Sequence, residues 1–363
     1  MKKIVCVILA LTLSLAITAC GGGATSTSAP PENTSASTGG ATTSPDASPS
    51  TDGYTGGSYT LKLGHYFGAQ QSNAKFVLQF ADLVAEKSDG KIVIDVYGES
   101  QLGGQNELCE ALHLGTIDLA VSDYVTFNSV LDHAKSIVAV LPWMLRDWDH
   151  AYAFSNSDIF ADINKELLES YDIRYIGIMV EGFKELFSRS PVYNAEDFKG
   201  LRVRVTPQIL YLEMFGALGA APTQVATAEL YTALQNGIVD AYERPADSAY
   251  TNSLWEQTNY MIMTNHVMAQ SGIFINEGVF QHLDKEAQAI IIQAGNEITE
   301  AYFAWSREND AMRLAQLVDE CSQERIDIDT SELKAIAQEN VWPILLENVD
   351  GAQAILATIE AMR

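Results

Sequence analysis

The fold is indicated first by residues 59–97, which read YTLKLGHYFGAQQSNAKFVLQFADLVAEKSDGKIVIDVY. Apolar residues alternate with polar ones over 59–64 and again over 91–97, which predicts two strands. Between these strands, apolar residues recur at helical spacing and predict a helix over 73–87. This strand-helix-strand order is typical of parallel strands with a helix packed on the face of the sheet.

The same alternation continues along the chain and begins again after residue 172. The further predicted elements are helices over 107–114, 209–218 and 228–236, and strands over 117–122, 173–179, 201–206 and from Asp240 onward. Two successive series of this kind predict an α/β protein with two lobes.

A long helix is predicted over 284–321, because this segment contains no Pro and no Gly except Gly295. Asp284 is a suitable N-cap for its first turn. At 1.5 Å per residue the helix would extend for roughly 55 Å, which is longer than one lobe. We therefore expect it to run across both lobes.

The N-terminus has the character of an export signal. A basic start and an apolar run over 5–17 are followed by small residues and Cys20. This is typical of a bacterial lipoprotein signal, with an ordinary secretory signal as the alternative. We predict a signal peptide over 1–19 and a lipidated Cys20 that begins a disordered tether of Gly, Ser, Thr, Pro and Ala over 20–57.

Composition excludes several classes of protein. The 363 residues include 22 basic and 47 acidic side chains, for a formal charge of −25. Nucleic-acid binding needs clustered Lys and Arg, and anionic membrane surfaces also repel such a chain. The chain has no nucleotide-binding loop, no nucleophile motif and no His or Cys spacing suited to a metal. We expect neither an enzyme, nor a cofactor, nor a metal site.

Two cysteines, Cys109 and Cys321, lie in the predicted globular part. They could form a disulfide, but each falls in an apparently helical segment. Two buried thiols are the favoured interpretation.

A family resemblance rests on motifs spread along the chain. They read KSDGKI over 87–92, QLGG over 101–104, LGTID over 114–118, FKGLRVRV over 198–205, LGA over 218–220 and ELYTALQNGIVD over 229–240. In this order they resemble the motifs of solute-binding proteins of tripartite ATP-independent periplasmic (TRAP) transporters, and the resemblance covers nearly all of residues 58–363.

The resemblance implies an α/β, two-lobed clamp of the periplasmic-binding-protein kind, with mixed sheets and a long helix spanning both lobes. Lobe I would comprise residues 58–181 and 270–309, and lobe II residues 182–269 and 310–363. The cleft would hold a linear organic acid, a mono- or dicarboxylate. The receptor, a monomer in the periplasm or lipid-anchored at the outer face of the cell membrane, would deliver the acid to a membrane permease driven by an ion gradient. Alternatives are a lipoprotein receptor of an ATP-driven importer, and an exported enzyme or sensor module.

Arg204 matches the signature arginine of the family, which implies that it binds the ligand carboxylate. A guanidinium suits this role because its planar fork matches a carboxylate through two hydrogen bonds. Lys184 stands where the family usually has a second arginine. It would either contact the same carboxylate or be a surface lysine.

Arg244 is a departure from the family, which commonly has an asparagine at this position. One hypothesis is that Arg244 binds a second carboxylate, so that the ligand is a diacid. Another is that it supplements Lys184 on a single carboxylate. The third is that it faces outward or pairs with a glutamate.

Lobe I is expected to contribute polar residues from the ends of its strands and loops, because open α/β sheets bind ligands at the carboxyl ends of strands. The candidates are Tyr66, Gln70, Gln71, Asn106, Asp123 and Tyr124.

Overall fold

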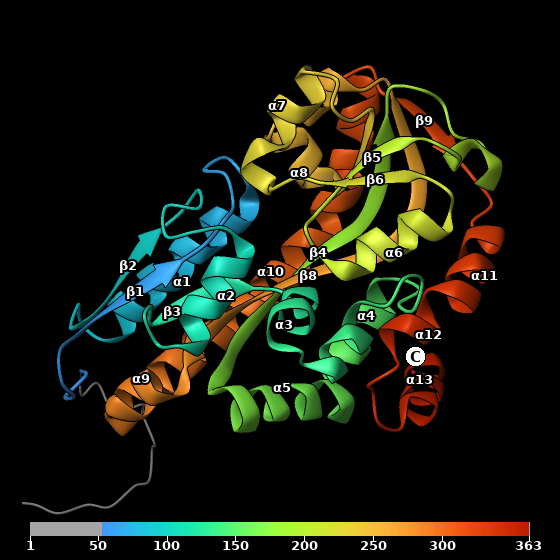
Figure 1. Ribbon diagram of the computed structural model, residues 1–363. Helices are drawn as coiled ribbons and strands as arrows, with labels where there is room; N and C mark the ends of the chain where they lie inside the picture. Colours follow the sequence, from blue (N-terminus) through green and yellow to red (C-terminus); the bar gives the residue numbers. More distant parts are fainter. Residues whose placement is uncertain (1–52, 363) are drawn as a thin grey trace, which may run out of the picture. The chain divides into compact units, whose positions relative to one another are not determined.

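The structure, a computed structural model, describes residues 53–362 (Figure 1). The predicted signal peptide, Cys20 and most of the tether therefore lie outside the described residues. The strands are β1 (Tyr59–Gly64), β2 (Ile92–Tyr97), β3 (Leu119–Ser122), β4 (Ile173–Ser188), β5 (Arg202–Val205), β6 (Ala221–Gln224), β7 (Ala241–Pro245), β8 (Tyr260–Asn276) and β9 (Glu324–Asp327).

The helices cover the faces and ends of these strands. The α-helices are α1 (Ser72–Lys87), α2 (Gln105–His113), α3 (Tyr124–Leu131), α4 (Trp148–Ser155), α5 (Asp158–Tyr171), α6 (Ile209–Ala217), α7 (Leu230–Gln235), α8 (Ala246–Thr251), α9 (Glu277–His282), α10 (Lys285–Asp319), α11 (Ser331–Asn340), α12 (Trp342–Leu345) and α13 (Ala352–Ala361). Short 3-10 helices are η1 (Ala134–Val140), η2 (Ala195–Phe198), η3 (Thr227–Glu229) and η4 (Leu254–Gln257).

Between residues 53 and 362 all nine strands belong to one mixed sheet, in the order β2-β1-β3-β8-β4-β7-β5-β6, with β9 paired to β8. The pairs β1–β2, β1–β3, β5–β6 and β5–β7 are parallel, whereas β8 pairs antiparallel with β3 and with β4. The long strands β4 and β8 thus connect two parallel groups of strands. This confirms the predicted α/β clamp with mixed pairing; the residue boundaries of the lobes stay a prediction.

The predicted strand over 173–179 begins at the right residue but is too short, because β4 continues to Ser188. Its pairing with β8 shifts register at three points, including one between Val180 and Gly182. Polar residues follow these shifts, so the sequence loses the alternation that marks a strand. The 17-residue β8 had no predicted counterpart for a related reason, since buried Thr264 and His266 interrupt its apolar run.

The long helix is confirmed as α10, which has 35 residues. Its N-cap is Asp284, whose side chain accepts a hydrogen bond from the backbone N–H of Ala287 at 2.9 Å. The helix packs against the connecting strand β4 and against α1 and α8, which follow strands of the two different parallel groups (Figure 1). A Cβ added to Gly295 would overlap the carbonyl oxygen of Ile176, so glycine permits this close approach of helix to strand.

The last residues of the predicted tether pack on the folded part. Tyr54 is buried, and its carbonyl accepts a hydrogen bond from Lys91 Nζ at 2.9 Å. The backbone N–H of Gly57 donates to Asp284 at 2.7 Å. Ordered contacts therefore begin before the predicted start at Ser58, because Tyr54 is a large apolar residue that can bury surface there.

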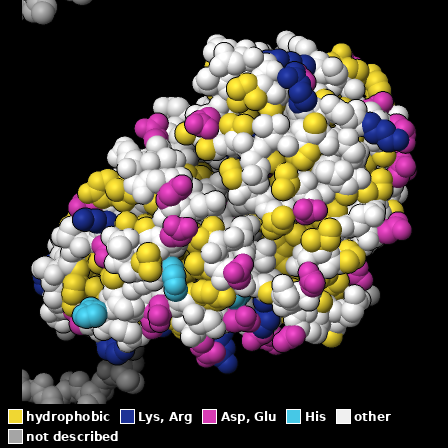
Figure 2. Space-filling view, viewed as in Figure 1, with side chains coloured by type: hydrophobic (Ala, Val, Ile, Leu, Met, Phe, Trp, Pro, Cys, Tyr) yellow, Lys and Arg dark blue, Asp and Glu magenta, His cyan; other side chains and the backbone are white. Residues whose placement is uncertain are grey.

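Cys109 and Cys321 are buried and unpaired, which confirms the two-thiol interpretation. Burial raises the pKa of Cys109 to about 12. Acidic side chains are spread over the face shown in Figure 2, where Lys and Arg are few, in keeping with the net charge. None of the helices between residues 53 and 362 combines the length and apolar character that a membrane span needs.

Candidate functional site

A polar cleft lies where β4, β7 and β8 meet the loops after β1, β3 and β5. Its innermost cavity has a volume of about 30 Å³, and two larger cavities of about 280 and 550 Å³ adjoin it. Tyr66 and Thr227 line all three cavities, so they form one connected cleft. The innermost part has room for only a few water molecules, so a larger ligand requires the walls to separate.

The structure brings five of the predicted site residues together around the innermost cavity. They are Tyr66, Gln71, Asp123, Lys184 and Arg244. Asn106 lines the largest of the three cleft cavities. Gln70 is exposed and lines none of the three.

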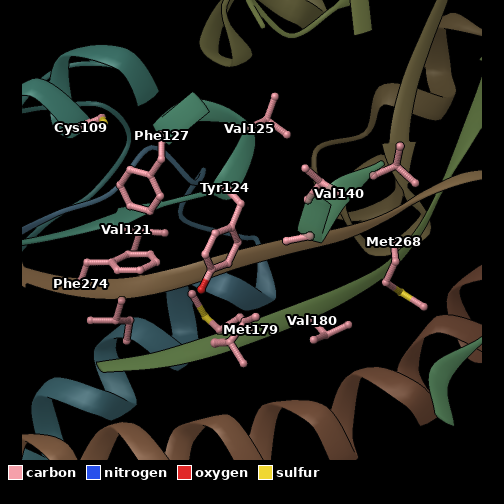
Figure 3. Packing of buried hydrophobic residues seen from close by; sticks show 14 of the residues in the cluster. Cys109, Val121, Tyr124, Val125, Phe127, Val140, Met179, Val180, Met268 and Phe274 are labelled. Carbon is pink, nitrogen blue, oxygen red and sulfur yellow. The ribbon is translucent and has the colours of Figure 1, made fainter. Parts of the chain in front are cut away.

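Tyr124 lies in the hydrophobic core near Phe127 and Phe274 (Figure 3) and lines none of the three cavities. Its hydroxyl donates to Asn164 Oδ1 at 2.9 Å, and the residue is completely buried. Its position after β3 suggested a cleft residue, but it begins α3 and packs inward. In this structure Tyr124 is a core residue.

Arg244 is the basic residue most available to a ligand. It lines both the innermost cavity and the adjoining 280 Å³ cavity. Its Nη2 donates to Thr227 Oγ1 at 2.7 Å, but its buried Nε has no hydrogen-bond partner. Among residues 53–362 it forms no ion pair with a carboxylate within 4.0 Å, unlike Lys184 and Arg204. The hypothesis of an outward-facing or Glu-paired Arg244 does not match this geometry.

Lys184 and Arg204 share a buried acid, Glu243. Lys184 Nζ lies 2.7 Å from Glu243 Oε2, and Arg204 Nη1 lies 3.7 Å from Glu243 Oε1. Burial alone would raise the pKa of Glu243, but Lys184, Arg244 and Arg204 together lower it to about 2. The charge of this glutamate therefore offsets part of the positive charge behind the cleft.

Arg204 is fully buried and lies one layer behind the cleft. Its Nε donates to the carbonyl of Val225 at 2.9 Å, and its Nη2 lies 3.5 Å from Thr227 Oγ1, the hydroxyl that also binds Arg244. Burial and, to a smaller extent, the charge of Arg244 lower the pKa of Arg204 to about 9. The guanidinium of Arg204 therefore stays protonated near neutral pH. Its role as the carboxylate anchor stays a prediction.

Polar bridges join the two walls of the cleft. Asp123 caps α3 by accepting from Thr126 N at 2.7 Å, and it also accepts from Gln208 Nε2 at 3.0 Å and from Gln105 Nε2 at 2.8 Å. A second bridge runs from Gln71 Nε2 to Ser248 Oγ at 3.1 Å. These hydrogen bonds link residues far apart in the sequence and keep the cleft narrow.

Sequence reasoning missed several polar residues of the innermost cavity. They are Gln105, Glu181, Thr206, Gln208, Thr227 and Gln270. Thr206 ends the predicted strand over 201–206 and Gln208 follows it, so the rule applied to lobe I would have found both residues here as well. Glu181 and Gln270 lie within long strands that the pattern did not delimit.

Comparisons with known proteins show the family of this chain. The family model "Bacterial extracellular solute-binding protein, family 7" (DctP) matches residues 63–347. A solute-binding protein of Sulfitobacter sp. strain NAS-14.1 is 30% identical over 71% of this chain and 78% of its own length. The sialic acid-binding periplasmic protein SiaP of Vibrio cholerae is 27% identical over 84% of this chain and 92% of its own.

A solved structure extends the similarity to three dimensions. A TRAP periplasmic solute-binding protein from Sulfitobacter sp., solved with bound α-D-taluronate, has a TM-score of 0.75 and 26% identity, and the match covers 83% of this chain and 97% of that one. These relatives are transport receptors, which confirms the expectation of a TRAP-type solute receptor and not an enzyme. This chain belongs to the bacterial extracellular solute-binding proteins of family 7, the DctP family.

Proposed function

We propose that this receptor binds an organic acid in the cleft with the ligand carboxylate on Arg244. The observation that carries the proposal is that Arg244 lines the cavity and, among the described residues, has no partner for its buried Nε and no ion pair with an acid within 4.0 Å. A buried cation without a counterion is costly, and a ligand carboxylate would supply the missing charge and hydrogen bonds.

Arg204 would support this contact from behind, because both arginines share Thr227. Lys184 would contribute less, since Glu243 already pairs with it at 2.7 Å and its ammonium lies 3.9 Å from the ring centre of Tyr211. On this account Arg244 and Arg204 act on one carboxylate, which corresponds to the single-carboxylate hypothesis more closely than to the diacid hypothesis.

The ligands named for two relatives support a carboxylate. One relative is named for sialic acid and another was solved with a uronate, and both compounds are carboxylic acids. The amides and hydroxyls around the cavity of this chain, including Gln71, Gln208 and Thr206, are suited to hydrogen bonding a polar acid.

The proposal extends to where the protein acts. Lipidation at Cys20 would hold the receptor at the outer face of the cell membrane, and residues 20–52 would link it to the folded part. A membrane permease of the TRAP type would receive the acid. Replacement of Cys20 by Ser should release the receptor from the membrane fraction if this anchor is correct.

A thermal-unfolding screen tests the binding proposal. The panel comprises straight-chain monoacids, diacids and sugar acids, with neutral sugars and amines as controls. A carboxylate at 100 times its Kd should add about 2.7 kcal/mol to the free energy of unfolding. Stabilisation by sugars or amines but by no carboxylate would contradict the proposal.

A further inference from the structure

Glu181 is an acid in the wall of the innermost cavity that has no basic partner. Its Oε1 accepts a hydrogen bond from Ser271 Oγ at 2.7 Å. Among the described residues it forms no ion pair within 4.0 Å, and its Oε2 accepts no hydrogen bond. Burial raises the pKa of this carboxyl, as expected for an acid without a counterion. Glu181 therefore offers a free acceptor to the cavity.

The backbone at Glu181 forms a β-bulge, which sets the direction of this side chain. Val180 pairs with Gln270 and Gly182 pairs with Ala269, so Glu181 is the extra residue of a β-bulge and has no partner across the strand pair. Gly182 has a φ of 107°, a conformation that favours glycine. Bulges redirect side chains and occur often beside binding sites.

Gln270 adds a second acceptor to the same cavity. Only 4% of its surface is exposed, and its Oε1 has no hydrogen-bond partner, whereas its Nε2 donates to the carbonyl of Ala139 at 3.2 Å. Asp123 lines the cavity as well, but its oxygens already accept hydrogen bonds from Gln105, Gln208 and Thr126. Glu181 Oε2 and Gln270 Oε1 are thus two acceptors that remain available to a ligand.

Among the described residues, the cavity wall holds one cation and two acids that form no ion pair within 4.0 Å. Lys184 and Arg204 pair with Glu243, which leaves Arg244 as the cation. The two acids are Asp123, whose oxygens already accept hydrogen bonds, and Glu181. A second ligand carboxylate would therefore approach Glu181 and be repelled. A protonated amine has three donors and no acceptor, which suits two free acceptor atoms better than the single donor of a hydroxyl does.

We infer that the ligand is a monocarboxylate that carries a protonated amine, with its carboxylate on Arg244 and its ammonium on Glu181 and Gln270. This inference rests on the proposed function, since it takes the carboxylate contact for granted. It makes Glu181 the residue that determines specificity for the second group of the ligand and excludes diacids as preferred ligands.

Matched series of acids test the inference by titration calorimetry with the purified protein. Each series has one carbon skeleton of three to six carbons and comprises the plain monoacid, its hydroxy and amino derivatives, and the diacid. In at least one series the amino acid should bind at least ten times more tightly than the hydroxy acid and the diacid. Glu181→Gln should remove most of that preference, because the amide has no negative charge.

Glu86→Gln is the control, because Glu86 is an exposed acid on α1 that lines none of the three cleft cavities. It should leave the ranking of ligands unchanged. Tightest binding of a diacid or a hydroxy acid would overturn the inference while the proposed function stands. An unchanged ranking in Glu181→Gln would do the same. Failure of every acid to bind, amino acids included, would overturn the proposed function and this inference together.

Discussion

Lys184 and Glu243 lie on neighbouring strands with Nζ 2.7 Å from Oε2, and both side chains are buried. Arg204 approaches the other oxygen of the same carboxylate, at 3.7 Å. One acid thus serves as counterion to two buried cations, Lys184 in the wall of the cleft and Arg204 behind it. The arrangement accounts for why Arg244 alone of the three basic residues is left for a ligand.

Replacing this acid should destabilise the fold. Glu243→Gln would leave Lys184 and Arg204 without a counterion in a buried setting, which costs about 3–5 kcal/mol. Urea unfolding at pH 7 measures the change. Glu86→Gln, at an exposed position on α1, is the control and should stay within about 0.5 kcal/mol of the wild type. A loss as small as that of the control would show that Glu243 is not the shared counterion.

Helix α10 should not tolerate a side chain larger than that of glycine at position 295, where the helix packs against β4. Gly295→Ala would press a methyl group against Ile176 and should cost about 1–3 kcal/mol. Gly216→Ala is a matched helical control, because an added Cβ there meets no atom within 4 Å. That control should be neutral or stabilise by up to about 1 kcal/mol. Equal effects of the two substitutions, measured by thermal unfolding, would argue against the close packing.

The stability of the protein should depend on pH through Glu185. Burial raises the pKa of this carboxyl from 4.5 to about 8, although hydrogen bonds from the backbone oppose part of that rise. The folded state therefore keeps a proton that the unfolded chain releases above pH 4.5. Its stabilising contribution is complete below pH 4.5 and is lost as the pH rises to 8.

Glu185→Gln removes this titration. The free energy of unfolding of the variant, relative to the wild type, should rise by roughly 3–5 kcal/mol between pH 4.5 and pH 8.5. Other groups titrate equally in both proteins and cancel in the difference. Urea unfolding at several pH values provides the measurement, with Glu86→Gln as control. A difference that does not change with pH would mean that Glu185 is ionised in the folded protein.

The sequence predicted those elements whose pattern is local. The strands and helix of residues 59–97 and the N-capped helix α10 follow from apolar periodicity and capping residues. Strand β8 was not predicted from the sequence. It is defined by antiparallel pairing with the distant strands β3 and β4, and it carries buried polar residues at its centre. Periodicity cannot report pairing of that kind.

The sequence predicted several residues of the site but not how deeply each one is buried. Motif and strand-end reasoning identified Arg244, Lys184, Asp123 and Tyr66, which do meet at the cavity. Arg244 lines the cavity and Arg204 is buried behind it, although both contact the hydroxyl of Thr227 on a short 3-10 helix. The spacing of residues in the sequence does not reveal which of the two arginines is more deeply buried.

The central claim is that Arg244 binds the ligand carboxylate, and a binding isotherm tests it most directly. Titration calorimetry would compare the most stabilising carboxylate of the screen on wild type, Arg244→Gln and Arg202→Gln. Arg202 is the control because it pairs with Asp240 at 2.7 Å on the surface. The account predicts binding about 100-fold weaker in Arg244→Gln, with Arg202→Gln unchanged. Wild-type affinity in a folded Arg244→Gln would contradict it.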